Sequence, residues 1–466
     1  MKKTKIVCTL GPATVKKSVL KMMIRSGMNS ARINLSHGDF TDYGRFVKII
    51  RSISEIPIIL DSKGREVRII TDKPLELKRG NLVKFGFHRK FSAYLDHNFS
   101  NEAKPGHRIF FDDGIIHAKI EEINSDYAII RCQNDGILKS GKRLNLPDTK
   151  LKLPSLHAKD IEGINFAAKN KIEFFALSFT TCKNDVLHLK KKLKETGSKT
   201  SVIAKIENSE GIDNFDEILK VSDGIMIARG DLGVELPSEK IPLLQKEMIR
   251  KCYTHGKIVI TATQMLQSMV ESTTPTRAET SDVANAILDG TDAVMLSAET
   301  AIGKYPVLAV MEMSKIAKEV EEKIIVNIHD PKMMDVTEAI SHSSYALQKA
   351  IPIDKMIVLT SSGYTARMMA RFRIAKDIIA ITPNFEVKKR LEMIFGLTPV
   401  YYPKFMDKDK VIIGARIAFK KKLVKADDTV LFTAGLYTRG KAVTNLIEIH
   451  KISDLIGHFD NKEKRT

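Results

Sequence analysis

The sequence predicts an α/β protein whose largest part is a (β/α)8 TIM barrel, with an all-β domain inserted into the barrel and an open α/β domain after it. Eight short apolar segments, each followed by an amphipathic helical stretch, recur within the first 300 residues. A long strand-rich interval separates the third of these segments from the fourth. After the eighth segment, further strand-like runs alternate with helical patterns, which is typical of a separate α/β sheet.

The predicted barrel strands are short runs rich in apolar and β-branched side chains, bounded by polar residues. They cover residues 5–10, 31–35, 57–60, 174–179, 201–206, 224–228, 257–262 and 292–296. Eight βα units in succession are the number that closes a barrel, and the active site of such a barrel lies at the carboxyl ends of its strands. Polar side chains follow most of these runs at that end, so we expect the chemistry there.

Residues 66–154 interrupt the barrel, which is therefore assigned to residues 1–65 and 155–328 as the catalytic domain. Alternating side chains and turn residues indicate that the insertion is a small all-β domain. Its strand-like segments are residues 82–87, 108–123 and 127–132. Because the insertion leaves the barrel at the expected catalytic end, we expect it to act as a lid that excludes water.

A helix predicted over about residues 306–323 completes the barrel, and residues 327–335 indicate a linker. Residues 329–466 are assigned to a C-terminal α/β domain with a regulatory role. Its strand-like segments are residues 355–359, 377–381 and 429–432. Helical patterns separate these segments, which favours an open sheet.

Composition and charge exclude several classes of protein. The 466 residues, 43% of them hydrophobic, suffice for two to four globular domains. No apolar stretch is long enough to span a bilayer and no signal-peptide pattern is present, so we expect a cytoplasmic protein without a membrane partner. The formal charge of +19 is spread over short, separated basic runs without a recognition motif. We therefore expect solvated helix faces that attract small anions, and no specific nucleic-acid binding.

The strongest candidate site combines one lysine with two acids at the ends of neighbouring predicted strands. Alternation places Lys205 and Glu207 on the same side of their strand, and Asp231 follows the next strand along the chain. Two carboxylates that leave most coordination positions open suit Mg²⁺, which retains much of its hydration. The alternative is a structural ion pair between Lys205 and one of the acids.

Two further clusters lie at the same end of the predicted barrel. After the second and third strands, Asn34, Ser36, Asp61 and Ser62 supply hard oxygens with one formal negative charge, which would suit a monovalent cation. Read without function, these residues are turn formers and a helix cap. Residues 228–233 form a glycine-containing turn whose free backbone amides would bind a carboxylate or phosphate, although an ordinary loop is the alternative.

Seven segments, in order along the chain, resemble the pyruvate kinase family. They are residues 4–12 (TKIVCTLGP), 27–38 (GMNSARINLSHG), 205–211 (KIENSEG), 228–235 (ARGDLGVE), 261–269 (TATQMLQSM), 275–286 (PTRAETSDVANA) and 297–300 (SAET). The resemblance extends from Lys5 to about Ile452. It implies transfer of the phosphoryl group of phosphoenolpyruvate to ADP, giving pyruvate and ATP in the last step of glycolysis.

The resemblance also implies cofactors and residue roles. Glu207 and Asp231 would bind Mg²⁺ or Mn²⁺, and Lys205 and Arg32 would neutralise the phosphoryl group, with Lys205 also stabilising the enolate. The residues implied to hold the substrate carboxylate are Gly230, Asp231 and Thr263. The implied K⁺ ligands are Asn34, Ser36, Asp61 and the carbonyl of Ser62. The implied ADP contacts are Pro12, His37, Arg68 and Lys142. The residues implied to carry a proton to the product are Ser297 and Glu299.

Some positions depart from the family pattern. Arg65 stands where proline is usual and Ser62 where threonine is common. Lys63 and Glu66 favour a requirement for K⁺, whereas Ile69 disfavours it. In the C-terminal domain, residues 360–365 (TSSGYT) resemble a loop that binds the phosphate of an effector, although a plain helix cap would have the same pattern. The resemblance further implies a homotetramer.

Two rival functions remain open at this point. The first is a Mg²⁺-dependent barrel lyase or aldolase that acts on pyruvate or phosphoenolpyruvate and needs neither a lid nor ADP contacts. The second is a basic, RNA-associated protein without catalysis, built on a retired enzyme. The intact set of Lys205, Glu207 and Asp231 counts against the second.

Overall fold

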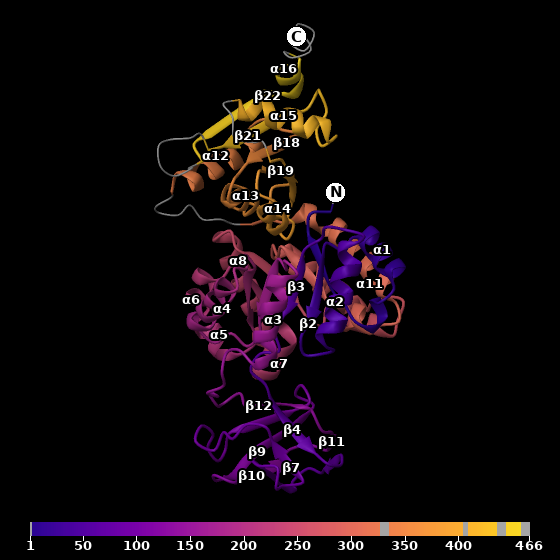
Figure 1. The fold of residues 1–466 in the computed structure, drawn as a ribbon, viewed down its shortest axis with the longest axis vertical. Coiled ribbons are helices and arrows are strands. Elements are labelled where there is room, and N and C mark those ends of the chain that lie inside the picture. The colour runs from indigo at the N-terminus through magenta and orange to yellow at the C-terminus, as the bar shows by residue number, and fades with distance from the viewer. Residues whose placement is uncertain (1, 327–334, 404–408, 436–443, 458–466) are drawn as a thin grey trace.

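The structure is a computed structural model that describes residues 2–326, 335–403, 409–435 and 444–457. Three bodies follow one another along its long axis (Figure 1). A closed barrel of eight strands lies in the middle, a closed barrel of seven strands at one end and a five-stranded sheet at the other. The predicted fold class is confirmed.

The central barrel is parallel throughout, in the strand order β1-β17-β16-β15-β14-β13-β3-β2. Its strands are β1 (Lys5–Thr9), β2 (Ser30–Asn34), β3 (Ile58–Asp61), β13 (Phe174–Leu177), β14 (Ser201–Ile206), β15 (Gly224–Ala228), β16 (Ile258–Ala262) and β17 (Ala293–Leu296). Nearly every residue of these strands is buried, as expected for a sheet covered on both faces. All the predicted barrel strands are present.

Amphipathic helices cover the outside of this barrel and bury one face each against the strands. They are α1 (Lys17–Ser26), α2 (Phe40–Arg51), α3 (Ala158–Lys169), α4 (Lys183–Glu195), α6 (Phe215–Val221), α8 (Ile241–Thr254), α9 (Arg277–Leu288) and α11 (Pro306–Val320). Short helices follow strands at the carboxyl end: α5 (Ser209–Asp213), α7 (Arg229–Glu235) and α10 (Ala298–Ala301). Single 3-10 turns occur at η1 (Pro12–Thr14), η2 (Ser238–Lys240), η3 (Gln267–Val270) and η4 (Glu321–Lys323). Within the described ranges, none of the helices has the length and apolarity to cross a bilayer.

The insertion is a closed β barrel with its own core. Its strands are β4 (Val67–Thr71), β6 (Leu82–Gly86), β7 (Ala93–Leu95), β8 (Arg108–Phe111), β9 (Ile116–Ile123), β10 (Tyr127–Cys132) and β12 (Arg143–Asn145). A two-stranded sheet of β5 (Leu75–Leu77) and β11 (Gly136–Leu138) accompanies them. The first and last strands, β4 and β12, pair with each other. We refer to residues 67–145 as the lid.

One predicted lid strand is wrong. The segment 108–123 is not one strand but two, β8 and β9, paired antiparallel. Asp112, Asp113 and Gly114 have φ angles of 52°, 55° and 84° and turn the chain between them. The aspartates tolerate this left-handed conformation better than most residues, so the hairpin is formed at modest cost.

The C-terminal sheet has the order β20-β19-β18-β21-β22. Its strands are β18 (Lys355–Leu359), β19 (Asp377–Thr382), β20 (Leu397–Tyr401), β21 (Thr429–Ala434) and β22 (Leu446–Lys451). Its helices are α12 (Val336–Ala350), α13 (Tyr364–Ala370), α14 (Phe385–Leu391), α15 (Lys410–Lys420) and α16 (Ile452–Ile456). Sequence analysis missed the two edge strands: β20 contains Pro399, and β22 is half-exposed and runs antiparallel to β21. The linker predicted at 327–335 lies outside the described residues except for Asp335, which caps α12.

The C-terminal domain is fixed to the amino end of the barrel by a buried ion pair. The Asp292 carboxylate, at the start of β17, accepts hydrogen bonds from Arg373 Nη1 at 2.8 Å and from the Phe395 amide at 3.0 Å. Arg373 also donates to the Gly290 carbonyl from Nε at 2.9 Å. The two charged side chains are 2% and 3% exposed. This arrangement leaves the carboxyl end of the barrel to the lid.

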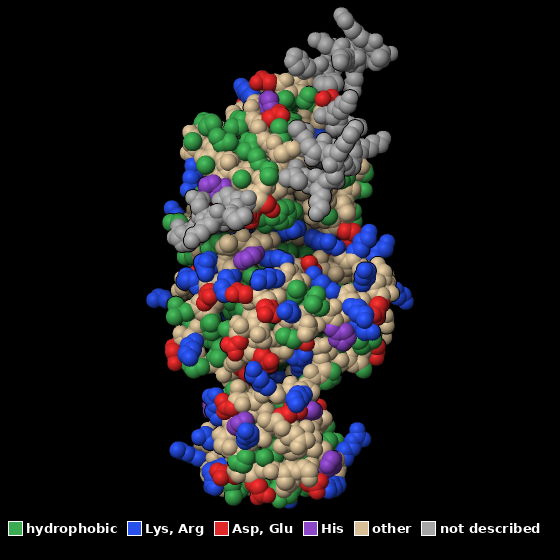
Figure 2. All heavy atoms as spheres, turned by 90° about the vertical axis from the view of Figure 1, so that its left-hand side faces the viewer, with side chains coloured by type: hydrophobic (Ala, Val, Ile, Leu, Met, Phe, Trp, Pro, Cys, Tyr) green, Lys and Arg blue, Asp and Glu red, His purple; other side chains and the backbone are tan. Residues whose placement is uncertain are grey.

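Figure 2 shows how charge is distributed over one face of the molecule. Lysine and arginine side chains lie over all three bodies and are interspersed with aspartate and glutamate. In this view the molecule is narrower where the central barrel meets the lid. On this face, the positive charge therefore does not form one continuous footprint of the kind expected for a nucleic-acid groove.

We expect Arg373→Ala to lower the free energy of unfolding by about 3 to 5 kcal/mol, because it leaves the Asp292 carboxylate buried without its cation. Urea denaturation followed by circular dichroism would measure this. Lys315→Ala is the matched control, since Lys315 belongs to an exposed pair with Glu312 and should leave the curve close to that of the wild type. Equal curves for the two variants would contradict the role given to Arg373.

Candidate active site

A cavity of about 540 Å³ lies between the carboxyl end of the central barrel and the lid. Most residues predicted for the site line it: Arg32, Asn34, Ser36, His37, Ser62, Arg68, Lys142, Lys205, Glu207, Gly230, Asp231, Thr263 and Ser297. Three predicted residues do not line it: Pro12, Asp61 and Glu299. The barrel thus brings together residues that are up to 265 positions apart in the sequence, counted from Arg32 to Ser297.

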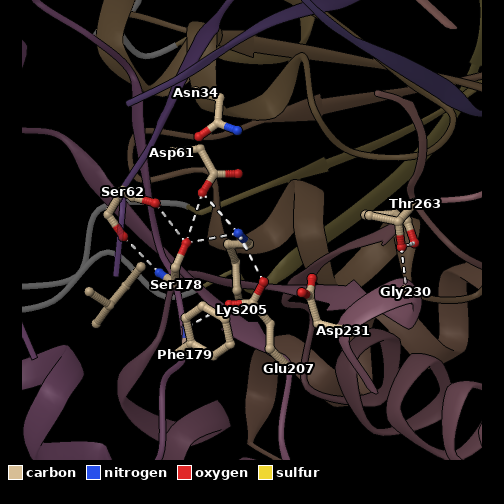
Figure 3. A network of polar contacts seen from close by, with 12 residues as sticks. Asn34, Asp61, Ser62, Ser178, Phe179, Lys205, Glu207, Gly230, Asp231 and Thr263 are labelled. Carbon is tan, nitrogen blue, oxygen red and sulfur yellow. Dashed lines mark hydrogen bonds and ion pairs between the residues drawn. The ribbon is translucent and has the colours of Figure 1, made fainter. Parts of the chain in front are cut away.

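Lys205 lies at the centre of the polar network on the cavity wall (Figure 3). Its ammonium group donates to Ser178 Oγ at 2.8 Å and lies 3.0 Å from both Asp61 Oδ1 and Glu207 Oε1. Burial lowers the pKa of this lysine, but the two carboxylates outweigh that effect and raise it. Lys205 is therefore a fixed positive charge that faces the cavity.

Asp61 joins Lys205 to a second cation. Its carboxylate is fully buried and accepts a hydrogen bond from Arg32 Nε at 2.6 Å, while Arg32 Nη1 donates to Thr9 Oγ1 at 2.9 Å. Burial acts to raise the pKa of Asp61, but Arg32 and Lys205 lower it below its usual value. Asp61 is thus an ionised bridge between two cations, and its described contacts include no helix amide to cap.

Glu207 is held from two sides. Its Oε1 contacts Lys205, and its Oε2 accepts a hydrogen bond from the Phe179 amide at 2.5 Å. Phe179 has a φ of 51°, an uncommon conformation for a bulky residue. Burial, together with the charges of Asp231 and Asp61, raises the pKa of Glu207 to about 7 against the opposing effect of Lys205. Burial is the largest of these effects, and a cation bound between Glu207 and Asp231 would favour the ionised form of Glu207.

Asp231 and Gly230 lie in α7, directly after β15. The Gly230 amide donates to Thr263 Oγ1 at 2.7 Å, so this amide is engaged rather than free as the sequence had suggested. Thr263 is β-branched and has a φ of 67°, a strained conformation of the kind that clusters at functional sites. Asp231 Oδ1 pairs with Arg143 Nη2 of the lid at 2.5 Å.

The predicted ligands of a monovalent cation come together. Asn34 and Asp61 are opposite each other in the register of β2 and β3, and Ser62 follows Asp61 (Figure 3). Asn34 Oδ1 accepts from the Ser36 amide at 3.0 Å, which is also the contact of an ordinary turn. No cluster of three or more His, Cys, Asp or Glu side chains suited to a metal ion was found in the described parts of the chain.

The predicted nucleotide contacts separate into two groups. Arg68 Nη1 donates to the Gly141 carbonyl at 2.6 Å, and Lys142 pairs with Asp112 at 2.6 Å, so both cations face the cavity from the lid side. His37 lines the barrel side. Pro12 lies in the exposed turn η1, away from the cavity wall.

Ser297 and Glu299 have different positions. Ser297 lines the cavity, and its buried Oγ has no hydrogen-bond partner among the described residues. Glu299 is fully buried, accepts from the amides of Ser297 at 2.6 Å and Leu266 at 3.1 Å, and has a pKa raised by burial. Glu299 therefore holds the backbone of Ser297 rather than facing a ligand.

Sequence analysis assigned no role to two residues of this site. Ser178 follows β13 and donates to Asp61 Oδ1 at 3.1 Å and to the Ser62 carbonyl at 2.8 Å. Its position at a strand's carboxyl end made it one of the polar side chains expected there, but the sequence did not indicate its partners. Arg143 lies in a short lid strand, and nothing in its local sequence indicates a partner in the barrel.

In the C-terminal domain, residues 360–365 form the start of α13. Thr360 Oγ1 accepts from the Gly363 amide at 3.0 Å and Ser362 Oγ accepts from the Tyr364 amide at 3.3 Å. These are the contacts of a turn and a helix start.

Comparisons with known proteins agree with this geometry. The model of the pyruvate kinase barrel domain matches residues 1–310, and that of the pyruvate kinase alpha/beta domain matches residues 338–450. Pyruvate kinase of Staphylococcus saprophyticus is 40% identical over 97% of this chain and 81% of its own length. Pyruvate kinase of Staphylococcus aureus strain MRSA252 is 40% identical over 98% of this chain and 82% of its own length.

A solved structure supports the same conclusion. The crystal structure of a pyruvate kinase from Cryptosporidium parvum superposes with a TM-score of 0.89 at 34% identity, covering 97% of this chain and 96% of that one. Together with the matched domains and the cavity between barrel and lid, these similarities show that the chain belongs to the pyruvate kinase family.

Proposed function

We propose that this pyruvate kinase transfers the phosphoryl group of phosphoenolpyruvate to ADP in the cavity between barrel and lid, with Lys205 as its central catalytic residue. The observation that carries this proposal is the buried ammonium group of Lys205, held 3.0 Å from Asp61 and Glu207 on the cavity wall. The reaction gives pyruvate and ATP, the last step of glycolysis.

Lys205 and Arg32 neutralise the transferring group. Phosphoryl transfer asks little covalent chemistry of a protein, so catalysis depends on alignment and on positive charge where negative charge develops. A cation about 4 Å from a phosphoryl oxygen contributes roughly 4 kcal/mol at an effective dielectric of about 20, before desolvation costs. Lys205 also stabilises the enolate that forms when the phosphoryl group leaves.

The family implies a divalent metal, and the acidic residues present fit one. Glu207 and Asp231 would hold Mg²⁺ or Mn²⁺, since their oxygens are the hard ligands these ions prefer. Burial and, to a smaller extent, the charge of Asp231 raise the pKa of Glu207, and a bound cation would offset both effects. When bound, the ion supplies a Lewis acid that polarises the oxygens of the phosphoryl group. Gly230, Asp231 and Thr263 orient the substrate carboxylate through the strained turn at Thr263.

We also propose K⁺ as a cofactor, held by Asn34, Ser36, Asp61 and the carbonyl of Ser62. Lys63 and Glu66, which favour a K⁺ requirement, line the cavity. Ile69, which disfavours it, is fully buried in the core of the lid and does not face the site. Because Lys63 and Glu66 are at the site and Ile69 is not, these positions favour a requirement for K⁺.

The remaining roles follow from the positions of the side chains. We propose His37, Arg68 and Lys142, which line the cavity, as ADP contacts. By family resemblance we also propose Pro12, which does not line it. Ser297 lies on the proton route to pyruvate, with Glu299 as the residue that positions it. By family resemblance we further propose domain boundaries at 1–65 with 155–328, 66–154 and 329–466, a homotetramer in the cytoplasm, and a phosphorylated effector at residues 360–365.

The direct test is pyruvate formation from phosphoenolpyruvate and ADP. We expect turnover only with Mg²⁺ or Mn²⁺ present, and several-fold faster turnover when K⁺ replaces Na⁺. A lactate dehydrogenase coupled assay would measure both. Absence of pyruvate with both ions present would refute the activity, whereas equal rates in Na⁺ and K⁺ would refute only the K⁺ site.

We expect Lys205→Ala to lower kcat by roughly 10² or more, because it removes the charge that faces the phosphoryl group and the enolate. Circular dichroism should show an unchanged fold. Lys192→Ala, which removes an exposed lysine paired with Glu195, is the matched control and should retain wild-type turnover. Near-normal turnover in Lys205→Ala would remove Lys205 from its role.

The raised pKa of Glu207 predicts a pH-dependent stability. Its folded pKa of about 7 is above the ordinary value of 4.5, so its stabilising contribution is complete below 4.5 and is lost as the pH rises to about 7. The Glu207→Gln variant has no titratable carboxyl group at this position. The metal-free variant should therefore gain stability relative to the metal-free wild type over this window, by up to about 1.4 kcal/mol per pH unit. Urea denaturation at several pH values would measure the difference, and a constant difference would contradict it.

A further inference from the structure

The lid contacts the barrel through Arg143. Of the ion pairs found among the described residues, the pair of Arg143 with Asp231 at 2.5 Å is the one that joins the lid to the central barrel. Weaker contacts surround it on α7: Asn145 Nδ2 donates to Glu235 Oε1 at 3.3 Å, and Gly114 lies beside Val234. Arg143 therefore holds the lid over the helix that carries Asp231.

The guanidinium group of Arg143 does not use all of its hydrogen-bond donors in contacts with the described residues. Its Nη2 is shared between Asp231 and, at 3.1 Å, Asp113 of the lid turn. Its Nε is buried and has no hydrogen-bond partner among the described residues. The side chain is 14% exposed and lines the cavity. A planar guanidinium that lines a cavity and has a donor without a partner is suited to the oxygens of a phosphate group.

A divalent ion at Asp231 would compete with this contact. Both proposed metal carboxylates are paired with protein cations: Glu207 with Lys205, and Asp231 with Arg143. A guanidinium and a divalent ion on the same carboxylate repel each other, so the ion weakens the hold of Asp231 on Arg143. Asp113, which is 73% exposed, offers only a weak alternative partner.

We infer that Arg143 is a further substrate-binding residue, supplied by the lid, which exchanges Asp231 for a phosphate oxygen in the cavity when a divalent ion binds Asp231. The inference rests on the proposed role of Asp231 as a metal ligand. Phosphoenolpyruvate and ADP both carry the required phosphate chemistry. Arg143 then connects the lid to the bound substrate, and its contact with Asp231 of the barrel is lost.

The test uses Arg143→Gln in the full-length protein. Mn²⁺ binding without substrates, measured by electron paramagnetic resonance, should be about 3- to 10-fold tighter in this variant, because the ion no longer displaces a guanidinium. Arg108→Gln is the matched control, since Arg108 of the lid pairs with Asp148, which is not a proposed metal ligand, and should leave Mn²⁺ affinity unchanged. Arg143→Lys keeps the charge and should bind Mn²⁺ like the wild type.

The substrate half of the inference is tested by steady-state kinetics at saturating Mn²⁺. The KM of the substrate whose phosphate Arg143 contacts should rise about 10-fold in Arg143→Gln, with a smaller change in kcat, and separate titrations of ADP and phosphoenolpyruvate identify which substrate it is. Wild-type KM values for both substrates would overturn the binding role.

Asp231→Asn separates this inference from the proposed metal site. Wild-type Mn²⁺ affinity in Asp231→Asn would overturn the metal site itself and the exchange with it. Weakened Mn²⁺ binding in Asp231→Asn, together with wild-type affinity in Arg143→Gln, would overturn only the exchange. Thermal unfolding of each variant confirms that the comparison is made on folded protein.

Discussion

The site depends on the mutual compensation of buried charges at the carboxyl end of the barrel. Arg32, Asp61, Lys205 and Glu207 form a row of alternating sign, and each neighbouring pair is within 3.0 Å. An isolated ion at this depth would cost several kcal/mol, so each member of the row depends on its neighbours to offset that cost. Arg32 lies in β2, Asp61 in β3 and Lys205 in β14, and Glu207 directly follows β14. The hydroxyl of Ser178, which follows β13, lies between Asp61 and Lys205. The strand register is therefore fixed by electrostatics as well as by packing.

The two ends of the barrel have different tasks. At the amino end, the Asp292 and Arg373 pair fastens the C-terminal domain with almost no exposure to solvent. At the carboxyl end, Phe179 and Thr263 have left-handed backbone conformations, and both aim polar groups at the site: the Phe179 amide contacts Glu207, and the Thr263 hydroxyl contacts the Gly230 amide. Stability is thus concentrated away from the chemistry, and backbone strain is concentrated beside it.

The parts of the structure that follow from local pattern could be predicted from the sequence. The barrel strands were found because a parallel strand covered on both faces is a continuous apolar run, and Lys205 and Glu207 because alternation sets which side chains face together. The hairpin at Asp112 and Asp113 was missed although Asp-Gly between apolar runs is a turn signal, because the apolar residues on both sides were read as one continuous strand. Arg143 could not be found, since its partner is 88 residues away and the contact depends on where the lid sits.

The pairing of β4 with β12 affects how the chain reaches this fold. In the central barrel, β3 pairs with β13, so Ile59 must pair with Phe174 although the whole insertion lies between them in the sequence. Bringing together the ends of so long a flexible segment is entropically costly and slows folding. Because β4 pairs with β12, a folded lid presents its two ends side by side, with Arg68 opposite Arg143. A lid that folds early therefore turns a long-range closure into a nearly local one.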